Sequence, residues 1–92
     1  MPAVLSFLWD EENEEEVWAH GLVPEQVDEV LLNMHIVSKN RKRRRASHRI
    51  IGQDNGGKCI TVPIQMTTMK GVWRPVTAWP ASEAERSKLR RR

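Results

Sequence analysis

The chain has 92 residues, enough for one small domain with a single core, and its one cysteine excludes an intramolecular disulfide and a four-sulfur zinc site. Nothing resembles a signal peptide or the stretch of about 20 apolar residues that spans a membrane, so we expect a cytoplasmic protein with no membrane partner. The net charge is +3, but half of the 12 acidic residues lie between 10 and 16 and seven of the 15 basic residues lie between 39 and 49, which indicates a polyanionic partner.

The N-terminal part of the chain predicts one strand followed by two helices. Residues 4–9 are expected to form the strand. Asp10 is a good N-cap for a helix that stops at Gly21, which suits a left-handed position. Pro24 opens the second helix, in which apolar residues follow the helical period up to Met34.

The middle of the chain predicts a β-hairpin. Residues 39–45 are too charged to be buried and are expected to form an exposed loop or the ragged start of a strand. Strands are expected at 48–53 and 58–65, joined by a turn at 54–57 in which successive positive φ angles suit Asn and Gly. Pro63 cannot donate a hydrogen bond to a neighbouring strand, so it marks an edge or a bulge.

The C-terminal part predicts a further strand at 72–79, interrupted by Pro75, and a final helix capped by Ser82. Consecutive strands joined by tight turns favour an antiparallel pairing. The expected fold class is therefore α+β: a small antiparallel sheet with the N-terminal helices and a C-terminal helix packed against it, in one domain over residues 1–92.

Three short blocks follow one another in a fixed order. They are Phe7-Leu8-Trp9-Asp10 with Asn13 and His20-Gly21, then Arg49-Ile50-Ile51-Gly52 with Gly57-Lys58, and last Trp73-Arg74-Pro75-Val76-Thr77-Ala78 with Ala81 and Glu85-Arg86. In order and spacing, from about residue 7 to 86, these blocks resemble the BrnT family of bacterial toxins. The resemblance implies a RelE-like fold and a type II toxin, a ribonuclease that cleaves mRNA without metal or cofactor and so inhibits translation. It also implies a cognate antitoxin that binds DNA and is ribbon-helix-helix-like.

Such a ribonuclease needs cations that hold the scissile phosphate, together with a base and an acid for two proton transfers. The resemblance places Arg74 as the phosphate clamp, since a guanidinium binds two oxygens at once, and His20 as the acid or base. His48 and Arg49 are further candidates, but adjacent strand residues point to opposite faces, so at most one can face the same phosphate as Arg74. Without these roles, Arg74 would be an exposed strand arginine and His20 would cap or pack at the end of the first helix.

A basic run is the clearest electrostatic signal and is expected to hold the RNA backbone together with Lys58. The run consists of Lys39, Arg41, Lys42, Arg43, Arg44 and Arg45. Three alternatives remain open for it: a solvated loop, a docking site for an acidic segment of the antitoxin, or a chance likeness to a nuclear-localisation signal.

The sequence departs from the family pattern at two places. Ser47 and His48 stand where relatives tend to carry an arginine and an aromatic residue, and Trp79 replaces the arginine of a Ser-Ala-Arg motif. Trp79 can stack on an RNA base, or it can pack in the core or against the antitoxin. Because of these departures, two alternatives stand beside the toxin. One is a non-catalytic nucleic-acid-binding or regulatory module on the same scaffold, and the other is a structural protein of a mobile element.

Overall fold

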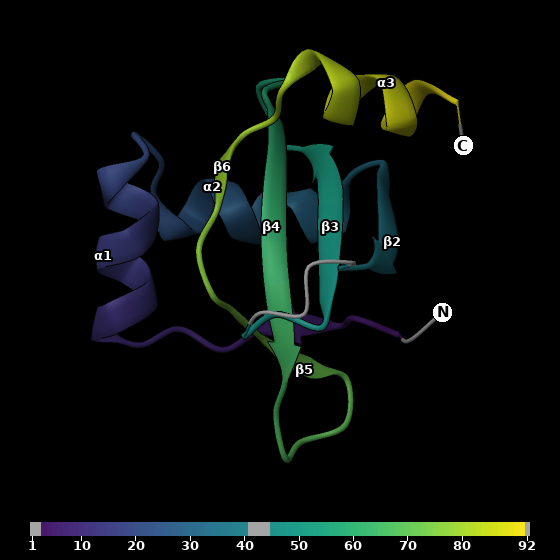
Figure 1. The fold of residues 1–92 in the computed structure, drawn as a ribbon. Helices are drawn as coiled ribbons and strands as arrows, with labels where there is room; N and C mark the ends of the chain where they lie inside the picture. The colour runs from purple at the N-terminus through teal and green to yellow at the C-terminus, as the bar shows by residue number, and fades with distance from the viewer. Residues whose placement is uncertain (1–2, 41–44, 92) are drawn as a thin grey trace.

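Six strands form one sheet in the computed structural model, which describes residues 3–40 and 45–91 (Figure 1). The strands are β1 (Ser6–Phe7), β2 (His35–Lys39), β3 (His48–Gln53), β4 (Cys59–Met66), β5 (Val72–Pro75) and β6 (Trp79–Pro80). Their order is β1-β5-β4-β3-β2, and β6 pairs with β4 beside β5. Every pairing is antiparallel except that of β1 with β5, which is parallel. The α+β fold class is confirmed.

The helices begin where local capping chemistry predicts. In α1 (Glu11–Ala19) the Asp10 side chain accepts the backbone N–H of Asn13 at 3.0 Å, and the Asn13 side chain accepts the backbone N–H of Asp10 at 2.8 Å. Pro24 opens α2 (Pro24–Glu29), which tightens into the 3-10 turn η1 (Val30–Leu32). Ser82 caps α3 (Glu83–Arg90). No helix in these ranges is long and apolar enough to cross a membrane.

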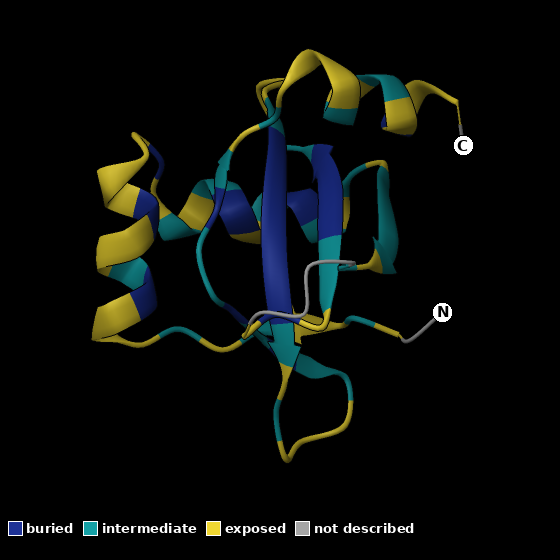
Figure 2. Cartoon of the chain, viewed as in Figure 1, coloured by how far each residue is buried: buried dark blue, intermediate teal, exposed yellow. Residues whose placement is uncertain are grey.

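The hydrophobic core lies between the sheet and the first two helices. Its buried members are Val17, Leu22, Val27 and Val30 from the helical side, with Ile50, Ile60, Val62, Ile64, Trp73 and Ala78 from the sheet side. Figure 2 shows this burial along β3 and β4 and on the inner turns of α1 and α2. The opposite side of the sheet is partly covered by α3, whose Leu89 is buried against it.

Three expectations from the sequence are wrong in detail. The helical stripe does not continue to Met34, because η1 ends at Leu32 and residues 35–39 pair with β3 as the unpredicted strand β2. The first strand shrinks to two residues, since only these meet β5. In the 54–57 turn, Gly57 has a φ of 89° and no residue other than glycine has a positive φ in the described part of the chain.

Pro63 marks an interruption in the sheet, as its missing N–H predicts. Its carbonyl accepts the backbone N–H of Val76 at 2.9 Å, in the gap that separates the pairing of β4 with β5 from its pairing with β6. Thr61 and Pro63, on the side of β4 that faces away from the core, are nonetheless buried. α3 lies on that side of the sheet and contacts β3.

Gly52 lies in β3 where the chain leaves no room for a side chain. A Cβ there would lie 2.6 Å from the Cβ of His35 and 2.7 Å from Cγ1 of Val30. We expect Gly52→Ala to lower the free energy of unfolding by about 1–3 kcal/mol, since overpacking forces neighbours apart. Urea denaturation measures this, with Gly56→Ala as the control, because a Cβ at Gly56 finds its nearest atom at 3.5 Å. Equal losses in the two variants would contradict the close packing over β3.

Candidate nucleic-acid interface

A groove of about 1070 Å³ opens on the side of the sheet that faces away from the core. Strand residues alternate between faces, so Arg49 and Pro63 point into this side while their neighbours Ile50 and Val62 enter the core. Among the described residues, four cations line the groove, together with one acid and one tryptophan. They are Lys39, Arg45, Arg49 and Lys88, with Glu85 and Trp79. The groove is therefore positively charged.

Glu85 organises one wall of this groove. Its carboxylate accepts hydrogen bonds from Nε1 of Trp79 at 3.2 Å and from the backbone N–H of Ser82 at 2.8 Å. Burial by itself raises the pKa of Glu85, but these hydrogen bonds outweigh it and the pKa is lowered. Glu85 thus stays ionised and holds the indole of Trp79 in place.

Arg49 contacts the same carboxylate more loosely. Its Nη1 lies 3.5 Å from Oε2 of Glu85, and its side chain is 23% exposed. A pair this long is at the outer limit of hydrogen bonding, and no other partner of its guanidinium lies in the described ranges. Most of the donors of Arg49 are therefore available to an anion in the groove.

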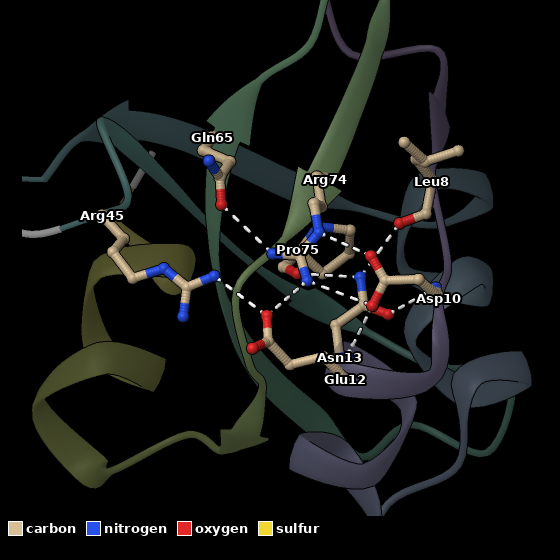
Figure 3. A network of polar contacts seen from close by, with 8 residues as sticks. All are labelled: Leu8, Asp10, Glu12, Asn13, Arg45, Gln65, Arg74 and Pro75. Atoms are coloured by element: carbon tan, nitrogen blue, oxygen red, sulfur yellow. Dashed lines mark hydrogen bonds and ion pairs between the residues drawn. The ribbon is translucent and has the colours of Figure 1, made fainter.

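Arg74, in contrast, is held by carboxylates (Figure 3). Its Nε donates to Oδ2 of Asp10 at 2.7 Å, its Nη2 to Glu12 at 2.8 Å, and its Nη1 to Gln65 at 3.2 Å. Hydrogen bonding to Asp10, and then to Glu12, raises the pKa of Arg74. The side chain is only 15% exposed. Arg74 is thus neither a solvent-exposed strand arginine nor an open phosphate clamp, because protein carboxylates occupy the donors that a phosphate would use.

Glu12 connects Arg74 to the end of the basic run. Its Oε1 accepts from Nη2 of Arg74 and from Nη2 of Arg45, the latter at 3.1 Å (Figure 3). The hydrogen bond from Arg45 and then that from Arg74 lower the pKa of Glu12. Arg45 and Lys39, which are predicted RNA contacts, both line the groove. The predicted RNA contacts of Arg41, Lys42, Arg43 and Arg44 fall outside the described residues.

The Asp10–Arg74 pair makes stability depend on acidity. Hydrogen bonds from Arg74, and then from the backbone of Asn13, lower the pKa of Asp10 from 3.8 to about 2. A depressed native pKa contributes stability above the unfolded pKa, and this contribution is lost as the pH falls through the folded pKa. We expect the melting temperature of the natural chain to fall more steeply between pH 4 and 2 than that of Arg74→Gln. Thermal melting followed by circular dichroism tests this. Equal slopes of melting temperature against pH in the two proteins would show that the pair does not couple stability to pH.

The two candidate imidazoles, those of His20 and His48, lie in different surroundings and contact different tryptophans. The exposed ring of His20 lies 6.3 Å from that of Trp79, beside the groove, although His20 does not line it. The ring of His48 packs edge-on against Trp73 at 5.2 Å, and its Nδ1 lies 2.9 Å from Oγ of Ser47. The structure therefore places His20 beside Trp79 and leaves His48 on the core side.

The remaining predicted contact, Lys58, lines a different pocket. Two charged groove residues, Glu85 and Lys88, are missing from the candidates predicted from sequence. Glu85 belongs to the third block of the family resemblance but had no assigned role there. Within the described ranges, no three His, Cys, Asp or Glu side chains are grouped so that they could hold a metal.

No protein-family profile matches the chain, and no curated protein is significantly similar to it. The resemblance to the BrnT family therefore rests on the three sequence blocks alone.

Proposed function

We propose that this chain is a type II toxin that binds single-stranded RNA in the groove and cleaves it without a metal, which arrests translation. One observation carries the proposal: in the described part of the chain, four cations and Trp79 line one groove. Cations neutralise the phosphates of a nucleic-acid strand, and an aromatic ring gives its bases a stacking surface. A groove that offers both is suited to a single strand.

In this proposal Arg49 takes the place of Arg74 as the phosphate clamp, because its guanidinium keeps open donors. The 2′-hydroxyl of the RNA attacks the neighbouring phosphorus, a base takes its proton, and an acid gives a proton to the departing 5′-oxygen. His20 is our candidate for proton transfer, since its ring adjoins Trp79 at the groove.

A second candidate function is RNA binding without cleavage. The position of the histidines favours it, because no imidazole is among the described residues that line the groove. The lowered pKa of Glu85 also makes this carboxylate a weak base. On this alternative the groove would hold RNA in the same way and the strand would stay intact.

The proposed partner is a ribbon-helix-helix-like antitoxin whose acidic segment covers the cationic groove in the cytoplasm. An acidic segment complements the cations that line the groove and would compete directly with RNA phosphates. Such a complex would make RNA binding and antitoxin binding mutually exclusive.

Incubation of the purified protein with end-labelled single-stranded RNA in EDTA tests the proposal, with growth of a naive host after induction as the cellular readout. We expect cleavage and growth arrest, and we expect His20→Gln to bind RNA without cutting it. Binding without scission by the natural chain, with normal growth, would favour the non-catalytic module. Absence of RNA binding would contradict both functions.

A further inference from the structure

A second pocket, of about 310 Å³, lies beside α3 and is also cationic. Lys58, Arg86 and Arg90 line it, and none of the described lining residues is acidic. Cys59, Pro80 and Leu89 contribute an apolar part of the wall. A pocket with this lining suits a phosphate that is attached to a less polar group.

The two arginines of this pocket, Arg86 and Arg90, are both paired with Glu83, and solvent screens these ion pairs. Arg86 and Arg90 contact opposite oxygens of Glu83 at 2.5 and 2.9 Å, and the Glu83 side chain is 68% exposed. Exposed pairs of this kind contribute little and exchange partners readily. Lys58 has no ion pair within the described ranges, so the three cations leave the pocket with a net positive charge.

The pocket and the groove are neighbours across one helix and one strand. From α3, Glu85 and Lys88 line the groove while Arg86, Leu89 and Arg90 line the pocket. In β6, Trp79 lines the groove and the next residue, Pro80, lines the pocket. An RNA strand with one base stacked on Trp79 can therefore extend across β6 to Lys58.

We propose that this pocket binds a further phosphate of the RNA strand that occupies the groove. Strands longer than a few nucleotides then bridge the two sites, whereas the shortest fill the groove alone. The identity of the strand rests on the proposed function. The attraction of the three cations for a phosphate does not depend on that function. Inorganic pyrophosphate should therefore bind to the same cations.

Cys59 provides a reporter inside the pocket, because it is the only cysteine of the chain and is partly exposed. The measurement is the rate of its alkylation by N-ethylmaleimide, followed by intact mass, with and without a ligand. At a dodecanucleotide concentration about ten times its Kd, we expect alkylation to slow about tenfold, because a bound strand shields the thiol in proportion to occupancy. A saturating trinucleotide is expected to leave the rate unchanged.

Charge-matched variants decide which cation matters. Lys58→Gln should abolish most of the protection by the dodecanucleotide, and Lys70→Gln, at an exposed lysine in the β4–β5 turn, should retain it. Each variant is compared with its own rate without RNA, so a change in thiol reactivity cancels. Equal protection in both variants would overturn the proposal.

Anisotropy of labelled RNA separates this inference from the proposed function. A dodecanucleotide that binds without slowing the alkylation overturns the second site and leaves RNA binding in the groove intact. If no RNA binds, both proposals fail, and protection by pyrophosphate would then assign the pocket to a free anion.

Discussion

Replacement of Arg49 by glutamine is expected to lower the affinity for single-stranded RNA by about ten- to hundredfold, because a hydrogen bond to a charged group contributes about 1.5–3 kcal/mol. The guanidinium of Arg49 is only loosely paired with Glu85, so little protein interaction is lost when it turns to a phosphate. The slope of log affinity against log salt should also decrease by about 0.7, the value for one phosphate contact on a single strand. Anisotropy titrations at several salt concentrations measure both quantities.

Two companion variants make this result specific to the guanidinium. Arg49→Lys keeps the charge but loses the fork that binds two oxygens, so its affinity should lie between those of the natural chain and Arg49→Gln. Lys70→Gln removes the same charge at an exposed residue that does not line the groove, so it should change little. Glu85 keeps its donors from Trp79 and Ser82 in the Arg49 variants, so we expect the fold to survive. Equal effects of Arg49→Gln and Lys70→Gln would mean that binding follows net charge alone.

The second large effect is expected at Asn13, which joins α1 to the sheet. Its buried Nδ2 donates to the carbonyls of Leu8 at 3.0 Å and Pro75 at 2.9 Å, and its Oδ1 accepts from Asp10. Asn13→Ala leaves the two carbonyls and the Asp10 N–H without these partners, so the free energy of unfolding should fall by about 2–4 kcal/mol. Urea denaturation followed by tryptophan fluorescence measures the loss.

Asn33→Ala is the matched control for Asn13→Ala. The Asn33 amide also donates to two carbonyls, those of Glu29 and Gln53, but the residue is only half-buried. Water can replace part of what this amide provides, so we expect a loss of about 1 kcal/mol. If the two variants lose equal stability, burial of Asn13 is not what makes its hydrogen bonds important.

The elements that the sequence predicts well are those specified by local chemistry. Asp10 and Ser82 cap helices through contacts within three residues, and Gly21 and Gly57 adopt the positive φ angles that stop a helix or close a turn. By contrast, β2 exists because it pairs with β3, and the parallel pairing of β1 with β5 joins residues far apart in the chain. Neither pairing leaves a local signal.

The same distinction applies to the site. The charge of Arg49 and Arg45 is visible in the sequence, and both line the groove. The neutralisation of Arg74 is not visible, because its partner Asp10 lies 64 positions earlier in the chain. Glu85 reaches the groove only because α3 folds back on the sheet.

The most direct test of the central claim is a map of the RNA contact surface by amide chemical shifts of the ¹⁵N-labelled protein. On titration with single-stranded RNA, we expect the largest changes at the indole N–H of Trp79 and at the amides of Arg49 and Lys88. Arg49→Gln should abolish these changes at the same RNA concentration. Changes confined to Asp10, Glu12 and Arg74, with a silent groove, would contradict the assignment of RNA binding to this surface.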